Sequence, residues 1–149
     1  MQIDEDLTVE NAKAVLGEYE ILNRISKRPD INLQSPTISD MPKGSSHGNS
    51  NQNKILSRLD AQVYVTNIHK VLALVKAESD TYYQIINLCY IHPLINDNAV
   101  WDHLNFSKAT FYRKQKEALV CFAAYCPPMP NFADPKDTGQ HELLVYKYS

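Results

Sequence analysis

The sequence predicts an all-α protein, a helical bundle preceded by an N-terminal helical arm and a flexible linker. Apolar residues recur every three or four positions through most of the chain, which is the spacing of one helix face. Between the first such segment and the rest lies a stretch rich in Ser, Asn, Gly and Pro, a composition that favours a linker. With 149 residues and 44% hydrophobic content, the chain can form one ordinary domain with a packed core.

The N-terminal arm is predicted to span residues 1–34 and the linker residues 35–53. Thr8 is the expected N-cap of the arm's helix, whose apolar stripe consists of Ala12, Val15, Leu16, Tyr19 and Leu22. Pro29 ends this helix. The linker reads "SPTISDMPKGSSHGNSNQN" and cannot bury enough apolar surface to offset the entropy cost of ordering it.

A helical domain is predicted to follow over residues 54–126. Its first helix is apolar on more than one side around Ile68 to Val75, so this part is either deeply buried or forms an oligomer contact. The next helix is expected to begin with Asp80 as its cap and to close at His92 and Pro93.

Residues 127–149 are predicted to form a C-terminal tail. Prolines at 127, 128 and 130 end the helical pattern. The later segment "HELLVYKY" is either a short strand or an unstructured end.

Two further helices are predicted near residues 97–123, in the outline of a helix-turn-helix. The first reads "NAVWDHL", and the second begins after Ser107, its N-cap, in "SKATFYRKQKEALVCFAAY". Helical spacing directs one set of side chains inward: Val100, Leu104, Phe111, Ala118, Leu119 and Phe122. It directs another set outward: Lys108, Ala109, Thr110, Tyr112, Arg113 and Lys116.

The outward set suits double-stranded DNA. Lys or Arg can bond guanine edges in the major groove, and a small side chain such as Ala109 allows close approach to a thymine methyl. Thr110 can bond a base or a phosphate, while Lys114 and Lys116 are expected to meet phosphates. Tyr112 is either a phosphate contact or a surface ring. The competing interpretation is that these cations form an ordinary solvated face.

The charge balance limits how DNA could be bound. The chain has 15 basic and 17 acidic side chains, which excludes a uniformly basic nucleic-acid coat. An anionic partner must therefore meet a local patch. Lys27, Arg28 and Lys43 could add phosphate contacts beside the predicted helix-turn-helix.

The sequence favours a cytoplasmic protein. Its three cysteines lack the even, regularly spaced framework of a small secreted domain. The N-terminus opens with acidic residues instead of a leader-like segment, and no apolar run is long enough to span a membrane.

Catalytic and metal chemistry is not predicted. Neither Cys89 with His92 nor Cys121 with Cys126 has the spacing of a structural zinc site. No glycine-rich phosphate cradle follows a strand, and no Ser, His and acid set can be proposed. We therefore expect no enzymatic activity and no cofactor.

Several of these residues resemble the ArpU-type transcriptional regulators of phages and prophages of Gram-positive bacteria. The resemblance extends from the N-terminal helix to about Ala123. It rests on "SPTISDMPKGSSHGN", on "YI" at residues 90–91, on Leu104 and Ser107, and on "TFYR", "AL" and "FA" within residues 110–123. The C-terminal half of this family resembles the helix-turn-helix of the fourth region of sigma factors.

The resemblance implies a regulator, such as an activator, that binds a phage promoter and controls late genes. It implies that Ser107 caps the recognition helix and that Lys108, Ala109, Thr110 and Arg113 face the bases. Tyr112 and Lys116 would lie nearer the DNA backbone. The sequence departs from the pattern at Lys114, where an apolar residue is common, and at "HPLINDN", which replaces a shorter polar turn.

Other functions and partners stay open. The chief alternative is a phage packaging or assembly protein of small-terminase type, in which the long apolar helix builds a ring. A third is a helical module whose basic face binds an acidic protein. For the regulator, a homodimer and contact with RNA polymerase are both consistent with the sequence.

Overall fold

The computed structural model describes residues 2–29, 57–132, 134 and 136–147, and within these residues the chain is mainly helical. The all-α prediction is therefore confirmed. The predicted linker, residues 35–53, lies outside the described residues, and the domain boundaries stay predictions. The helices are α1 (Glu5–Gly17), α2 (Tyr19–Ser26), α4 (Arg58–Glu78), α5 (Asp80–Ile86), the π-helical segment η3 (Asn87–Ile91), α6 (Asp97–His103) and α7 (Lys108–Tyr125).

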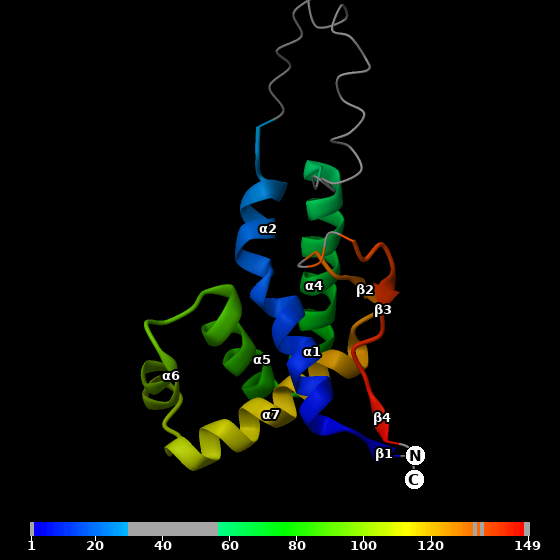
Figure 1. Cartoon of the computed structure of the whole chain (residues 1–149). Coiled ribbons are helices and arrows are strands. Elements are labelled where there is room, and N and C mark those ends of the chain that lie inside the picture. The colour runs from blue at the N-terminus through cyan, green and yellow to red at the C-terminus, as the bar shows by residue number, and fades with distance from the viewer. Residues whose placement is uncertain (1, 30–56, 133, 135, 148–149) are drawn as a thin grey trace, which may run out of the picture.

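The helices form a bundle in which α2 and α4 run side by side while α7 crosses below them (Figure 1). Helix α1 packs on α7, and α5 packs on both α4 and α7. Helix α6 lies to one side of this assembly, beyond α5 (Figure 1). No helix in the described ranges combines the length and apolar character needed to cross a bilayer.

The first helix begins earlier than the sequence suggests. Asp4 is its N-cap, and the Asp4 carboxylate accepts a hydrogen bond from the Leu7 amide at 3.1 Å. The prediction of Thr8 as the cap was wrong, because the acidic residues at the start of the chain supply a cap one turn earlier. Thr8 is fully buried, and its hydroxyl accepts a hydrogen bond from the Val145 amide at 3.0 Å.

Serines are the N-caps of α4 and α5. Ser57 caps α4 by accepting a hydrogen bond from the Asp60 amide, and Ser79 caps α5 by accepting one from the Tyr82 amide. The prediction of Asp80 as the cap was therefore wrong by one position, because the extended backbone needed at an N-cap occurs at Ser79. Helix α5 continues into η3, which ends at His92 as predicted.

The main core joins α1, α2, α4 and α7. Four side chains of α4, Ile68, Val71, Leu72 and Val75, are at most 3% exposed and lie inside this core. Their burial accounts for the broad apolar surface of this helix within a single chain. A homodimer, which stays a prediction, would need other residues of α4, such as the exposed Leu59, Val63 and Leu74.

A second, smaller core lies under α6. It consists of the fully buried Ile85, Val100 and Phe111, from α5, α6 and α7 respectively. Half-buried apolar side chains surround them: Leu88, Cys89, Trp101, Leu104 and Phe106. Because α7 contributes to both cores, its first turns are held by the small core and its later turns by the main one.

The C-terminal segment packs back onto the bundle. Strand β4 (Tyr146–Lys147) pairs antiparallel with β1 (Gln2–Ile3), and β2 (Met129–Pro130) pairs antiparallel with β3 (Gln140–His141). Between these strands, Leu143 is 2% exposed, and its carbonyl accepts a hydrogen bond from the Asn11 amide group at 3.0 Å. The short-strand alternative for this tail is therefore correct.

Candidate nucleic-acid interface

The turn between α6 and α7 has a defined geometry. The Asn105 amide donates to the Asp102 carbonyl at 3.2 Å, and the Phe106 amide donates to the Trp101 carbonyl at 2.9 Å. Asn105 has a positive φ of 61°, the left-handed conformation that ends many helices. This turn fixes where α7 begins relative to α6.

Ser107 caps α7, as predicted. Its side-chain oxygen accepts a hydrogen bond from the Thr110 amide at 3.2 Å, and its hydroxyl donates to the Thr110 hydroxyl oxygen at 3.0 Å. Since Thr110 accepts in this second bond, its own hydroxyl hydrogen stays available for another acceptor. Ser107 therefore orients the Thr110 side chain as well as starting the helix.

Helix α7 presents two different faces. The predicted inward residues Phe111, Ala118, Leu119 and Phe122 are at most 1% exposed. Lys108, Ala109 and Arg113 are exposed, and Lys114 is half-buried. The predicted sorting is therefore present for these residues, whereas Thr110 and Leu104 are both half-buried; the DNA contacts stay predictions.

Gln115 is a buried residue that the sequence analysis missed. It lies one turn beyond Phe111, is 8% exposed, and its amide group donates to the Cys89 sulfur at 3.7 Å. Burial raises the pKa of the Cys89 thiol to about 11, so the thiol stays protonated at neutral pH. Because Gln115 points inward, the neighbouring Lys114 lies at the edge of the exposed face of α7 and is half-buried.

Tyr112 connects the two helices. Its hydroxyl donates to the Asp97 carboxylate at 3.1 Å, and this bond raises the pKa of the Tyr112 hydroxyl. Its ring also contacts the rings of Trp101 and Phe111 edge-on, with centroids 5.8 and 5.1 Å away. Tyr112 therefore braces α6 against α7, and the negative Asp97 lies where a phosphate contact was expected.

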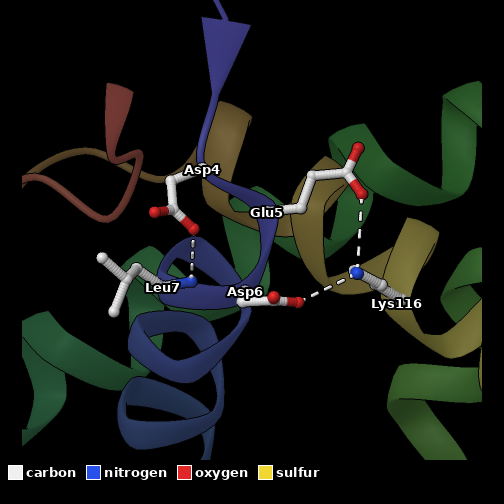
Figure 2. A network of polar contacts seen from close by, with 5 residues as sticks. All are labelled: Asp4, Glu5, Asp6, Leu7 and Lys116. Carbon is white, nitrogen blue, oxygen red and sulfur yellow. Dashed lines mark hydrogen bonds and ion pairs between the residues drawn. The ribbon is translucent and has the colours of Figure 1, made fainter. Parts of the chain in front are cut away.

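Lys116 forms ion pairs with two acidic residues of α1. Its ammonium group lies 3.0 Å from an Asp6 carboxylate oxygen and 3.7 Å from a Glu5 carboxylate oxygen (Figure 2). The hydrogen bond with Asp6 raises the pKa of Lys116, and the same bond lowers the pKa of Asp6. Sequence spacing could not reveal this contact. The acidic residues near the N-terminus showed only that partners for a cation were present in the chain.

Three cations of α7 have no such partner. Lys108, Arg113 and Lys114 form no ion pair with any carboxylate in the described residues. Of the other predicted phosphate contacts, Lys27 and Arg28 follow the end of α2 and are exposed, whereas Lys43 lies outside the described residues. The free positive charge of α7 is therefore concentrated in its first two turns.

Comparisons with known proteins give one informative relationship. No family model matches the chain, and no solved structure matches it. A protein of Enterococcus hirae named "Putative autolysin regulatory protein ArpU" is 29% identical over 123 residues, which cover 82% of this chain and 88% of that protein. Over most of its length, therefore, the chain is similar to a protein named as a regulator, at the level of a distant relative.

Proposed function

We propose that this protein is a sequence-specific DNA-binding transcriptional regulator, which acts on late genes of a phage or prophage in the bacterial cytoplasm. One observation carries the proposal. The first two turns of α7 carry the exposed Lys108 and Arg113 and the half-buried Lys114, none of which pairs with a carboxylate among the described residues, while the buried Phe111 anchors the same turns from behind. Such a surface can approach DNA without unfolding or breaking an internal ion pair.

The regulatory part of the proposal draws on the relative. The protein from Enterococcus hirae is named as regulatory, and the similarity includes most of both chains. The assignment to phage late genes rests on the ArpU-type pattern in the linker and in α7. The relative's name describes a regulator and no enzyme, which supports a non-catalytic role for this chain as well.

The exposed side chains of α7 divide into two roles in this mechanism. With the N-terminal half of α7 in the major groove, Lys108 and Arg113 contact guanine edges, and Ala109 allows the backbone to approach closely. Thr110 offers its free hydroxyl hydrogen to a base or phosphate oxygen. Lys114, at the edge, contacts the phosphate backbone.

The decisive experiment begins with selection of bound sites from a random duplex library by the purified protein. Binding to the selected site is then measured by mobility shift for the wild type, Arg113→Ala and Lys108→Ala. Loss of a bidentate base contact should cost Arg113→Ala about 1–3 kcal/mol at the cognate site and relax specificity at one position.

Lys70→Ala is the matched control, because Lys70 is an exposed cation that belongs to α4 and not to α7. Its removal changes net charge by the same amount and should alter affinity less than Arg113→Ala does. Selection of no consensus site, or equal losses in all three variants, would contradict sequence-specific reading by α7.

The number of copies on DNA separates regulation from packaging. A lone recognition helix contacts few base pairs, so a regulator is expected to bind as two copies at two half-sites. Sedimentation of the complex with selected DNA should show this stoichiometry. A large ring bound at genome ends would instead support the small-terminase alternative.

A further inference from the structure

A second polar surface lies between α2, α4 and η3, away from the residues of α7 discussed above. It consists of two adjoining cavities of about 610 and 230 Å³ that share His69, Ile91 and His92. The larger cavity also has Lys27 in its lining, and the smaller has Lys76. We call this continuous surface the histidine groove.

The charge of the histidine groove differs from that of the chain. Acidic side chains outnumber basic ones overall, 17 to 15, yet no carboxylate is among the described residues that line either cavity. Two lysines and two histidines do line it. A concave surface with charge of one sign concentrates ions of the other sign.

Neutral hydrogen-bonding groups complete the larger cavity. Their side chains come from Tyr19, Asn23, Ser26, Gln62 and Thr66, of which those of Tyr19, Ser26 and Gln62 also form hydrogen bonds within the protein. Hydroxyl and amide groups of this kind supplement cations where proteins bind phosphate oxygens. The smaller cavity is more apolar, with Leu72, Ala73 and Tyr83 in its lining.

Both histidines are held by one ring nitrogen and free at the other. The Nε2 atom of His69 lies 2.9 Å from the Tyr19 hydroxyl, and the Nδ1 atom of His92 lies 3.0 Å from the Asn87 side-chain oxygen. The described residues provide no hydrogen-bond partner for His69 Nδ1 or for His92 Nε2. These two atoms are therefore available to a ligand while the rings keep their orientation.

We propose that the histidine groove binds a phosphate group through Lys27, His69 and His92. The phosphate belongs either to a small phosphorylated compound or to a DNA backbone, which share the same recognition chemistry. This inference does not rest on the proposed DNA-reading role of α7, because none of its residues belongs to that helix.

Binding should depend on pH. A protonated histidine carries a hydrogen on both ring nitrogens and can therefore donate to a phosphate oxygen. The charged or titratable groups that face the two rings from the surrounding elements are Lys27, Lys76, Tyr19 and Tyr83. None of these side chains is a carboxylate, so a bound phosphate would supply the anion that favours a protonated histidine.

The test is a titration of the intact protein followed by NMR of the histidine ring protons. Inorganic phosphate and pyrophosphate are added at pH 6 and pH 8, with ionic strength held constant by chloride. The signals of His69 and His92 should shift saturably and at lower concentrations at pH 6. His103 and His141 lie outside the groove and serve as internal controls. Signals are assigned from His69→Gln and His92→Gln.

A Lys27→Gln variant tests the site further. Loss of this exposed cation should weaken phosphate binding by about two- to fivefold. Arg24→Gln is the matched control, because Arg24 lies in the last turn of α2, just before Lys27, but pairs with Glu20 at 3.2 Å and does not line the groove. Equal shifts of all histidines, no shifts, or equal effects of the two variants would overturn the proposal.

DNA binding by the same variants identifies the source of the phosphate. If the groove meets a DNA backbone, Lys27→Gln should weaken binding to all sequences and reduce the salt dependence by about one unit. If the groove takes a small compound, pyrophosphate binding should fall while DNA binding stays unchanged.

Discussion

The backbone conformation of Asn105 sets the direction of the chain between α6 and α7. Its φ of 61° lies in a region that asparagine tolerates and β-branched residues avoid. The two backbone hydrogen bonds around it satisfy carbonyls at the end of α6. The adjacent Trp101 and Phe106 side chains both pack at the small core, so the backbone turn and the apolar contact support one another.

Substitution of Asn105 should separate backbone preference from side-chain contacts. Asn105→Val is expected to lower the free energy of unfolding by about 1–2 kcal/mol, because valine is strained in the left-handed region. Asn105→Gly should be tolerated, since glycine adopts this conformation freely. Urea unfolding of the three proteins measures both effects. Equal stability of the valine and glycine variants would show that the turn changes its conformation on substitution.

Individual residues also show what the sequence could predict. Burial of Phe111, Ala118, Leu119 and Phe122 followed from helical spacing, because α7 is regular through both cores. Gln115 was missed because only apolar residues were used to trace the inward face, whereas its amide group donates to the Cys89 sulfur inside the protein. The cap at Ser107 was predicted correctly, whereas at the start of α1 the cap is Asp4 and not Thr8.

At the level of elements, α1 and α7 are joined by charge as well as by packing. Asp6 and Glu5 lie in the first turn of α1, and both approach Lys116 (Figure 2). This contact was outside the reach of sequence reasoning, because it joins residues 110 positions apart. For a DNA-binding α7, it means that Lys116 already has anionic partners.

Releasing Lys116 should strengthen DNA binding. In Asp6→Asn the ammonium loses its nearer carboxylate partner and can contact a phosphate instead. Affinity for DNA is expected to rise, and the plot of log affinity against log salt should steepen by about 0.9. Mobility shifts at several salt concentrations measure both quantities.

Glu10→Gln controls for net charge, because Glu10 is an exposed residue of the same helix and is not an ion-pair partner of Lys116. A second check is Lys116→Gln, which should cancel the gain in the Asp6→Asn background. If Asp6→Asn and Glu10→Gln have the same effect, general charge rather than release of Lys116 accounts for the change.

For the molecule as a whole, the bundle is stabilised by cores that contain protonated thiols. Burial raises the pKa of Cys121 to about 11 and that of Cys126 to about 12, from an ordinary value of 9.0. The folded state therefore holds these protons more tightly than the unfolded state does. Their contribution is complete below pH 9 and is lost as pH rises toward the folded-state pKa values.

Unfolding experiments at alkaline pH should reveal this linkage. For wild type, the free energy of unfolding should fall between pH 8 and pH 10.5, with roughly 1–2 kcal/mol of the loss due to Cys126. In Cys126→Ala the decrease should be smaller by that amount. Val120→Ala, a truncation on α7 without a titrating group, should lose as much as wild type. The same decrease in all three proteins would assign the effect to other groups.

The general architecture was within reach of sequence reasoning, while its long-range connections were not. Local periodicity and caps identified the helices, because those signals lie within a few residues of each other. The pairing of β1 with β4 joins short segments from opposite ends of the chain, and two-residue strands carry almost no periodic signal. Which helices share a core was likewise settled by packing rather than by propensity.

The hydrogen bonds between the start of the first helix and residues 143 and 145 also determine when, during synthesis, the fold can be completed. Thr8, Asn11 and Asp4 bond to backbone groups at residues 143 and 145, so the first helix lacks these partners until the ribosome has added those residues. During translation, the surface of the N-terminal helices that the C-terminal segment later covers stays exposed. Completion of the native bundle is therefore tied to the emergence of residues 143–147 from the exit tunnel.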